Sequence, residues 1–238
     1  MVNRLVDSPS LYLRKHGENP IDWWPWCDEA LQQGQRDDKP IFLSIGYPSC
    51  HWCTVMEGEA CSNPTIADYS NPNFLPIKVD REECSDLDSI YMQVLQMLTG
   101  SGGWPLNVVL TPDTLVPFYG GTYFPVEPKY GRPRLLRIFK ALRQFYNSDK
   151  GKLGAMTQEV MANLHKALLD LHQASLGSAQ PGSANAWLQL AITTQQEFDQ
   201  WLWSPDQGGY FNIAMGWWLR GTGVKAGAGV LATLAFTY

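Results

Sequence analysis

The stretch Ile41-Phe42-Leu43-Ser44-Ile45-Gly46-Tyr47-Pro48-Ser49-Cys50-His51-Trp52-Cys53 decides the fold of this chain. It opens with an apolar run of strand length over 41–46, which Pro40 and the turn-forming residues 46–49 bound on either side. Such a run is typical of a parallel strand that is buried on both faces. Two cysteines with two residues between them follow at its carboxyl end, where a helix is expected to begin.

Apolar spacing and capping residues predict that helices and strands alternate along the chain. The expected helices span about 25–38, 50–60, 63–69, 86–98, 133–147 and 160–171. The expected strands span 41–46, 74–80, 106–110 and 115–119, and turn residues join the last two as an antiparallel hairpin. This order predicts an α/β fold in which helices flank a central mixed sheet.

The Cys50-His51-Trp52-Cys53 motif lies at a strand-to-helix junction inside a strand-helix-strand unit, a context that is typical of thioredoxin-like redox sites. A thiolate at a helix N-terminus faces unpaired backbone N–H groups and the positive end of the helix dipole, which lowers the pKa of the thiol. Cys50 is therefore the candidate nucleophile. One helical turn brings Cys53 close enough to resolve a mixed disulfide, so Cys53 is the candidate resolving thiol.

Four further residues are candidates for the substrate-binding surface. Trp104 and Pro105 follow a glycine-rich segment and directly precede the expected strand at 106–110. In thioredoxin folds a cis proline occupies this place and faces the two cysteines, so we expect a cis peptide bond here. His51 and Trp52, between the cysteines, complete the set. His51 either stabilises the neighbouring thiolate when it is protonated or is an exposed polar residue on the first helical turn.

A series of motifs along the chain carries a family resemblance. They are Asn19–Trp23, Lys39–Tyr47, Cys50–Cys53, Lys78–Glu83, Gly102–Leu106 and Gly120–Pro125. In this order they resemble the N-terminal thioredoxin-like domain of the spermatogenesis-associated protein 20 family, over about residues 3–175. The resemblance implies a thioredoxin fold, followed in full-length members by a large α/α-toroid domain similar to those of sugar epimerases and glycosidases.

The resemblance sets the expected domain organisation. A thioredoxin-like domain is expected over 1–175, a flexible linker over 176–185, and a short, mainly helical start of the toroid domain over 186–238. Gly208-Gly209 and the aromatic residues after them look like the element that opens the toroid domain, but the Pro-Lys-Phe-Pro signature of the family does not follow. We therefore expect this second domain to be incomplete, as in a truncated or frameshifted member.

The thioredoxin-like part departs from the pattern as well. Thr54 stands where the family usually has His, and Cys84-Ser85 replaces an Arg-Pro pair. Ser44 stands six residues before Cys50, at the position where thioredoxin itself carries a buried acid. This puts the usual proton transfer of thioredoxin in doubt. Glu57 or Asp80 could replace that acid, although a solvated surface position is the simpler expectation for both.

Composition narrows the function further. The 238-residue chain has 18 Lys and Arg against 23 Asp and Glu, a net charge of -5 and no basic run, so nucleic acid is not an expected partner. With neither a signal-peptide core nor an apolar stretch of about 18 residues, no membrane association and a cytoplasmic location are expected.

The five cysteines are an odd number, which argues against a disulfide framework. No cofactor is expected, and the expected partners are a protein or small-molecule disulfide and a thiol reductant.

Two other functions stay open on the sequence alone. In one, the domain is a non-catalytic interaction module that binds a partner near Trp104-Pro105 while the cysteines are idle. In the other, Cys50 and Cys53 bind a metal ion together with Cys61, Cys84 or His51. A compact zinc site normally has two close pairs of ligands, and neither Cys61 nor Cys84 has a partner at short spacing. The sequence therefore favours a redox pair over a metal site.

Overall fold

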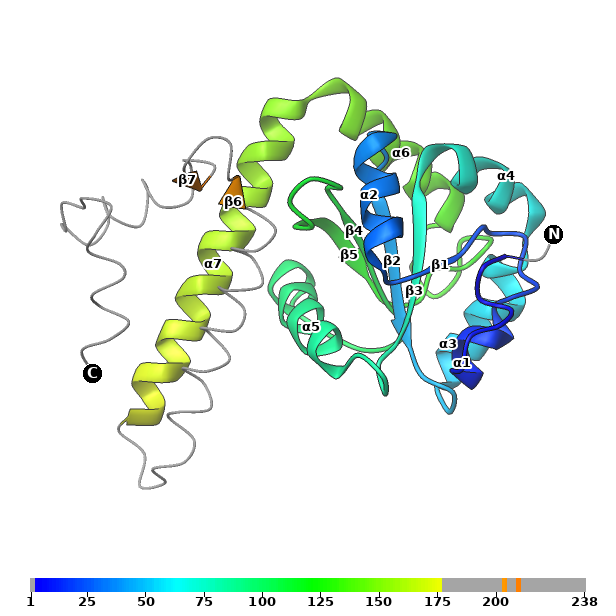
Figure 1. The fold of residues 1–238 in the computed structure, drawn as a ribbon, viewed down its shortest axis with the longest axis horizontal. Coiled ribbons are helices and arrows are strands. Elements are labelled where there is room, and N and C mark those ends of the chain that lie inside the picture. Colours follow the sequence, from blue (N-terminus) through cyan, green and yellow to red (C-terminus); the bar gives the residue numbers. More distant parts are fainter. Residues whose placement is uncertain (1–2, 177–202, 205–208, 211–238) are drawn as a thin grey trace. The chain divides into compact units, whose positions relative to one another are not determined.

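A computed structural model of the chain describes residues 3–176, 203–204 and 209–210, and the chain divides into two compact units, 1–160 and 161–238 (Figure 1). The helices are α1 (Leu11–Lys15), α2 (Asp28–Arg36), α3 (His51–Met56), the π-helical turn η1 (Glu57–Cys61), α4 (Pro64–Asn73), α5 (Ser85–Thr99), α6 (Leu135–Ser148) and α7 (Lys150–Leu176). The strands are β1 (Trp24–Pro25), β2 (Ile41–Gly46), β3 (Leu75–Asp80), β4 (Leu106–Leu110), β5 (Pro117–Gly121), β6 (Trp203–Ser204) and β7 (Gly209–Tyr210).

The first unit is built on a five-stranded mixed sheet with the order β1-β3-β2-β4-β5. The strands β1, β3 and β2 are parallel, whereas β4 runs antiparallel to β2 and β5 antiparallel to β4. The predicted central strand at 41–46 is β2, in the middle of this sheet, and the predicted hairpin is the β4–β5 pair. The predicted α/β fold with a central mixed sheet is confirmed, and it is thioredoxin-like.

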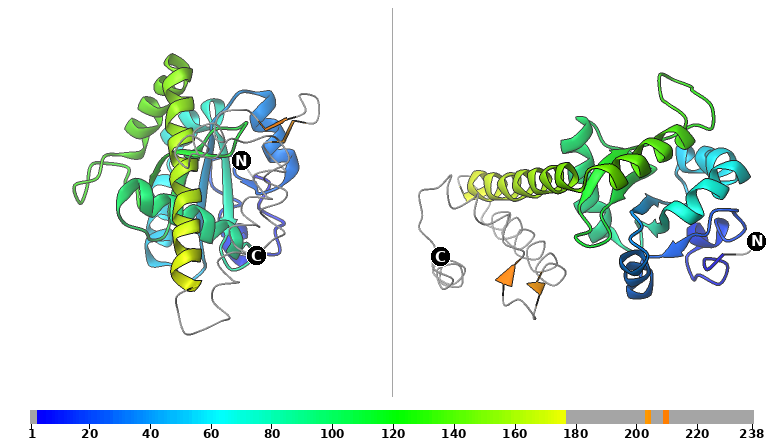
Figure 2. Two further views of the ribbon diagram at one scale, coloured as in Figure 1. Left: turned by 90° about the vertical axis from the view of Figure 1, so that its left-hand side faces the viewer. Right: turned by 90° about the horizontal axis from the view of Figure 1, so that it is seen from above.

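Helices cover both faces of the sheet (Figures 1 and 2) and form two separate hydrophobic cores. One core includes residues of α1, α3, α4 and α6 together with Phe42 of β2. The other includes residues of α2 and α5 together with Leu43 and Ile45 of β2. Because successive side chains of a strand point to opposite faces, β2 contributes to both cores. We call the face of the sheet that carries the first core, with Cys50 and Cys53, the disulfide face, and the face that carries the second core the apolar face.

Several boundaries differ from the sequence-based expectation; α4, for example, continues to Asn73, and α7 spans Lys150–Leu176 where a helix over about 160–171 was expected. Helix α2 begins at Asp28, and Trp24–Pro25 instead forms the edge strand β1, where a proline is tolerated because an edge strand needs no second set of backbone donors. In helix α5 the N-cap position is Cys84, whose side chain makes no capping hydrogen bond, and Asp86 lies in the first turn, where a carboxylate interacts well with the helix dipole. Strand β5 begins at Pro117, two residues later than expected.

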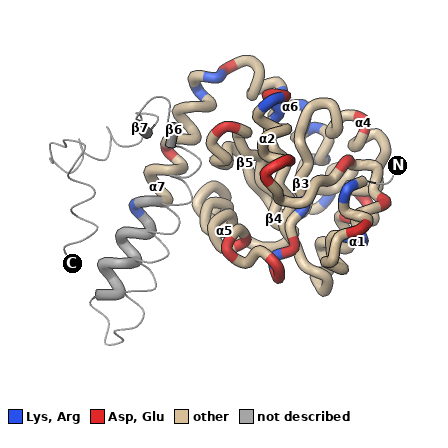
Figure 3. Tube along the Cα trace, viewed as in Figure 1, with Lys and Arg blue, Asp and Glu red and all other residues tan. Residues whose placement is uncertain are grey.

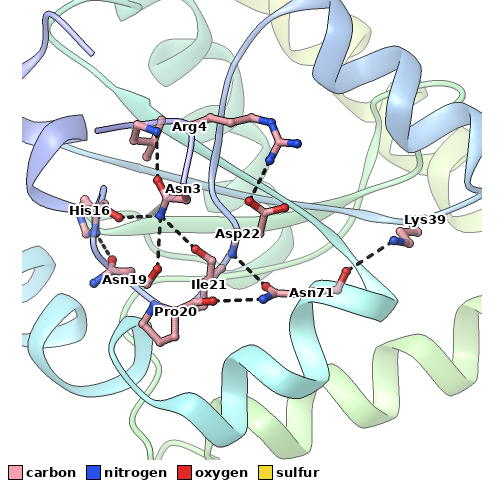
Figure 4. A network of polar contacts seen from close by, with 10 residues as sticks. Asn3, Arg4, His16, Asn19, Pro20, Ile21, Asp22, Lys39 and Asn71 are labelled. Atoms are coloured by element: carbon pink, nitrogen blue, oxygen red, sulfur yellow. Dashed lines mark hydrogen bonds and ion pairs between the residues drawn. The ribbon is translucent and has the colours of Figure 1, made fainter. Parts of the chain in front are cut away.

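The N-terminal segment is tied to the first unit by a polar network, drawn in Figure 4. The buried amide Nδ2 of Asn3 donates to the backbone carbonyls of His16, Asn19 and Ile21, at 2.8, 3.4 and 3.1 Å. Asn71 of α4 continues the network, because its Nδ2 donates to the Pro20 carbonyl at 3.1 Å. These bonds hold the segment that carries α1 against the rest of the fold.

The second unit has little described structure beyond the end of α7. Strands β6 and β7 pair antiparallel, with Trp203 opposite Tyr210 and Ser204 opposite Gly209. The linker expected over 176–185 lies outside the described residues except for Leu176, the last residue of α7, and of the mainly helical start of the toroid domain expected from 186 onward only 203–204 and 209–210 are described, as the strands β6 and β7. The domain organisation expected for 176–238 therefore stays a prediction. Among the residues that the structure does describe, no helix has both the length and the apolar character needed to cross a bilayer.

Candidate redox site

The two cysteines of the motif form a disulfide at the start of α3, with an S–S distance of 2.10 Å and Cα atoms 5.2 Å apart. Both residues are buried, with 4% of Cys50 and 3% of Cys53 exposed. The site lies at the carboxyl end of β2, where the segment 47–50 turns the chain into the helix. The predicted pair is thus brought together as the sequence indicates.

Cys50 occupies the N-cap position of α3. Its Sγ accepts a hydrogen bond from the backbone N–H of Cys53 at 3.1 Å, and its carbonyl accepts one from the backbone N–H of Thr54, also at 3.1 Å. A sulfur that already receives a helix N–H is stabilised as a thiolate once the disulfide is reduced. The N-cap geometry therefore supports Cys50, rather than Cys53, as the nucleophile.

Trp104 and Pro105 lie at the same end of the sheet as the disulfide. Strand β4 begins directly after Pro105, and its first residue pairs with Ile45, next to the end of β2. The Trp104–Pro105 peptide bond is cis. The Trp104 ring packs edge-on against Tyr47 of the segment before Cys50, with ring centroids 5.7 Å apart.

The Trp104 side chain is fixed by two charged residues, Asp88 and Arg81. Its Nε1 donates to Oδ1 of Asp88 at 2.7 Å, and the Arg81 guanidinium lies 4.0 Å from the ring centroid. Arg81 also forms an ion pair with the buried Asp88 carboxylate, with Nε 3.3 Å from Oδ2. Sequence reasoning identified Trp104 but missed Arg81 and Asp88, since no local pattern indicates that they share one partner.

His51 and Trp52 lie on the outer side of the motif. His51 is exposed, and Trp52 is 41% exposed, although its ring contacts Tyr123 and Tyr130 with centroids 5.0 and 5.9 Å away. The Tyr123 hydroxyl donates to Glu59, and burial together with this carboxylate raises the pKa of Tyr123 to about 12. The exposed rings of Trp52 and Tyr130 contact the buried ring of Tyr123 and form an aromatic patch next to the cysteine motif, of which the sequence indicated only Trp52.

A row of buried polar side chains crosses the three central strands on the disulfide face. Lys78 of β3 and Asn107 of β4 both lie opposite Ser44 of β2 in the strand register. The Lys78 Nζ donates to the Ser44 Oγ at 3.0 Å. All three residues are no more than 2% exposed, and burial lowers the pKa of the Lys78 amine. At the position where thioredoxin carries a buried acid, this chain therefore has Ser44, whose hydroxyl accepts a hydrogen bond from the buried Lys78 amine.

The two carboxylates considered as replacements for that acid have other partners. Asp80 is buried, and its Oδ2 accepts from the Ser10 hydroxyl at 2.6 Å while its Oδ1 accepts from the Glu82 backbone N–H at 3.0 Å. The expectation of a surface position is therefore wrong for Asp80, because the N-terminal segment covers it. Glu57 is partly exposed and forms an ion pair with Lys15 at 3.4 Å.

The metal hypothesis finds no ligand set in the structure. Cys50 and Cys53 are bonded to each other, and Cys61 and Cys84 are free thiols. Within 3–176 and the two short strands beyond, no group of three or more His, Cys, Asp or Glu side chains could hold a metal ion.

In the view of Figure 3, acidic and basic positions are interspersed over the described residues rather than gathered by sign.

Comparisons with known proteins agree with the resemblance found in the sequence. A family model named Thioredox_DsbH, described as a protein of unknown function, DUF255, matches residues 2–165. Spermatogenesis-associated protein 20 of Homo sapiens is 43% identical over 183 residues, which are 76% of this chain and 23% of that protein. An uncharacterised protein of Caenorhabditis elegans is 53% identical over 129 residues, 54% of this chain and 18% of that protein. The chain thus spans less than a quarter of the length of these relatives.

Two solved structures match part of the chain at low sequence identity. A thioredoxin from Thermus thermophilus superposes with a TM-score of 0.41 and 22% identity, covering 57% of this chain and 93% of its own. A structure described as DsbH oxidoreductase superposes with a TM-score of 0.38 and 17% identity, covering 54% of this chain and 85% of its own. The fold assignment itself rests on the strand order and on the family model.

Proposed function

This chain belongs to the DUF255 family of DsbH-like thioredoxin domains, and we propose that it is a thiol-disulfide oxidoreductase that acts through Cys50 and Cys53. The observation that carries the proposal is the Cys50–Cys53 pair at the N-cap of α3, within bonding distance and at the carboxyl end of the central strand. Family and fold alone do not establish an activity, so the proposal depends on what this site can do chemically.

The proposed reaction is a pair of thiol-disulfide exchanges. In the first, the Cys50 thiolate attacks one sulfur of a substrate disulfide, so that a mixed disulfide forms and the other substrate sulfur leaves as a thiolate that takes a proton from water. In the second, Cys53 loses its proton to water and attacks the Cys50 Sγ, which releases the remaining substrate sulfur as a thiolate. The substrate gains two electrons, and the cysteine pair becomes the disulfide. A thiol reductant then restores the dithiol.

Two surfaces beside the pair would receive the substrate. On one side, the backbone before Pro105 would pair with an extended substrate segment, and Trp104 is fixed there by Asp88. On the other side, Trp52 with His51 would contact the substrate through an exposed aromatic ring. The proposed substrate is a protein or small-molecule disulfide that reaches the sulfur between these surfaces.

The experiment that tests this proposal separates the roles of the two cysteines. Reduced wild type, Cys50→Ser and Cys53→Ser chains are mixed with glutathione disulfide, quenched with acid and analysed by peptide mass spectrometry. We expect Cys53→Ser to accumulate one glutathione on Cys50, because no thiol resolves the adduct. The wild type should oxidise to the Cys50–Cys53 disulfide, and Cys50→Ser should react more slowly by at least tenfold.

Cys61→Ser is the matched control, since it removes a buried thiol from the same face of the sheet without touching the pair. It should behave as wild type. Equal reactivity of wild type and Cys50→Ser would contradict the assignment of the nucleophile. If no variant forms an adduct or a disulfide, the oxidoreductase proposal fails and the domain is better studied as an interaction module.

A further inference from the structure

The hydroxyl of Tyr12 is a buried polar group that the proposed reaction has not used. Tyr12 lies on α1 and is 3% exposed, and its hydroxyl has no hydrogen-bond partner among the residues that the structure describes. A buried hydroxyl without a partner destabilises the folded state, so native proteins keep few of them. A partner that exists in only one state of the protein would explain it.

The position of this hydroxyl identifies the missing partner. A Cβ built on Gly46 would lie 2.2 Å from the Tyr12 hydroxyl oxygen and 2.8 Å from the Cys53 Sγ. Both atoms therefore occupy the space that the missing side chain of Gly46 leaves open at the end of β2. No larger residue fits at this position without moving the tyrosine or the sulfur, so Gly46 allows the hydroxyl to lie beside the disulfide.

Tyr12 is held in this place by contacts on α1 and beyond. Ser10 caps α1 by accepting from the Leu13 backbone N–H at 3.1 Å, and its own hydroxyl donates to the buried Asp80 carboxylate. The His16 ring packs edge-on against the Tyr12 ring with centroids 5.1 Å apart. The backbone carbonyl of His16 is in turn bound by Asn3 in the network of Figure 4. The orientation of Tyr12 is therefore determined by the fold and not by the disulfide.

The surroundings of Tyr12 keep its hydroxyl protonated. Burial raises the pKa of Tyr12 well above its usual value, and the nearby acidic groups Cys61, Asp80 and Glu57 raise it further. The Lys78 amine lies on the same face, 5.6 Å from the Tyr12 ring centroid, and donates to Ser44. A phenol that keeps its proton can donate a hydrogen bond, but it cannot act as a general base at neutral pH.

We propose that the Tyr12 hydroxyl is the hydrogen-bond donor that stabilises the Cys53 sulfur whenever the Cys50–Cys53 bond is open. The inference rests on the proposed oxidoreductase function and adds a residue to it. When Cys53 has lost its proton to water and before it attacks Cys50, its thiolate accepts from Tyr12. In the reverse direction, a substrate thiolate attacks the Cys50 Sγ, and the S–S bond breaks with its electron pair on Cys53. The Tyr12 hydroxyl then donates a hydrogen bond to the resulting Cys53 thiolate. The phenol proton stays on Tyr12 in both directions.

The first experiment compares wild type with Tyr12→Phe in redox equilibrium with glutathione. Phenylalanine keeps the ring and removes the donor. In the disulfide form it therefore removes a destabilising unpaired hydroxyl, and in the dithiol form it removes the proposed hydrogen bond to Cys53. Both effects favour the disulfide. We expect the equilibrium constant for reduction to fall about tenfold, which is a potential about 30 mV more negative for two electrons.

The second experiment measures the Cys53 thiol alone, in Cys50→Ala and in Cys50→Ala/Tyr12→Phe. The rate of alkylation by iodoacetamide is followed as a function of pH. We expect Tyr12→Phe to reduce the thiolate fraction of Cys53 about tenfold at a given pH below its pKa. Tyr91→Phe is the matched control, because it removes a buried tyrosine hydroxyl from the apolar face, and it should change neither quantity.

The outcomes distinguish this inference from the function on which it rests. If the wild type forms no reversible disulfide, the proposed function fails. If the wild type titrates and Tyr12→Phe agrees with it within twofold in both experiments, only the role of Tyr12 is overturned. Should Tyr12→Phe fail to fold by circular dichroism, 3-fluorotyrosine incorporated at position 12 replaces it. This stronger donor should shift the thiolate fraction of Cys53 upward, and no shift would overturn the proposal.

Discussion

The two faces of the sheet share the same strands and differ in the side chains that these strands present. On the apolar face, β2 contributes Leu43 and Ile45 to a core that α2 and α5 close. On the disulfide face, the same strand presents Ser44, with Lys78 in register on the neighbouring strand, and Gly46, which lies next to the Cys53 sulfur. A buried polar row costs stability unless its members bond one another. Both faces carry a hydrophobic core, and the difference is that the disulfide face also holds a buried polar row on the strands next to the cysteine pair.

Substitution on the apolar face should have the largest effect on stability and none on redox behaviour. Ile77 of β3 is fully buried in the core between the sheet and helices α2 and α5. Ile77→Ala should lower the free energy of unfolding by about 2–5 kcal/mol, because it leaves a cavity in a close-packed core. Denaturant unfolding measures this loss. A change of more than twofold in the glutathione equilibrium of Cys50 and Cys53 would show that the two faces are not independent.

On the disulfide face, Ser44→Ala removes the hydrogen-bond acceptor that the described residues provide for the Lys78 amine. Among the described residues the buried amine then keeps only ring contacts and no hydrogen-bond acceptor, and we expect a loss of about 1–3 kcal/mol in the free energy of unfolding. The double variant Ser44→Ala/Lys78→Met removes both members of the pair and should recover most of that loss. Equal stability of Ser44→Ala and wild type would mean that the row contributes no structural pairing.

The disulfide face should also make stability depend on pH. Burial and the nearby Lys78 hold the pKa of His16 well below its usual value. As the pH drops through about 6.5, His16 becomes protonated in the unfolded chain but stays neutral in the folded chain. The free energy of unfolding therefore falls below about pH 6.5, by up to about 1.4 kcal/mol per pH unit. His16→Phe should remove this slope, whereas His51→Asn, at an exposed position, should keep it. Parallel pH profiles for wild type and His16→Phe would contradict the account.

The smallest effect on stability is expected at the outer edge of the disulfide face. Trp52 is 41% exposed, so Trp52→Ala should change the free energy of unfolding by less than about 1 kcal/mol. Its proposed role is in binding, and the rate of reduction of a peptide disulfide should therefore fall several-fold. Reduction of the Cys50–Cys53 bond by dithiothreitol, which needs no aromatic contact, serves as the internal comparison. Equal losses with both reagents would point to a changed disulfide rather than a lost contact.

Local patterns were sufficient to predict the frame of the site. The apolar run at 41–46 matches β2, and the cysteine motif and Trp104-Pro105 lie at one end of the sheet, as expected. These features are encoded within a few neighbouring residues, which is the range over which periodicity and turn chemistry act. The two-residue strand β1 escaped prediction because it is too short to show a period.

The polar interior of the site could not be predicted, because it depends on strand register and on distant segments. Lys78 bonds Ser44 across 34 positions of sequence, and the Tyr12 hydroxyl, on a five-residue helix near the N-terminus, shares with the Cys53 sulfur the space beside Gly46. The one local signal was Gly46, which ends the strand and reads as an ordinary turn residue. The burial of Asp80 was missed for the same reason, since only the fold brings Ser10 over it.

The most direct test of the central claim is a redox titration of the purified chain in glutathione buffers, with alkylation and peptide mass spectrometry to locate every disulfide. We expect one reversible two-electron transition that is confined to Cys50 and Cys53, with a potential in the range of cellular thiol couples, about -120 to -270 mV. Cys27, Cys61 and Cys84 should remain thiols throughout. A transition that involves another cysteine, or a Cys50–Cys53 pair that never closes, would contradict the claim that the disulfide face is a redox centre.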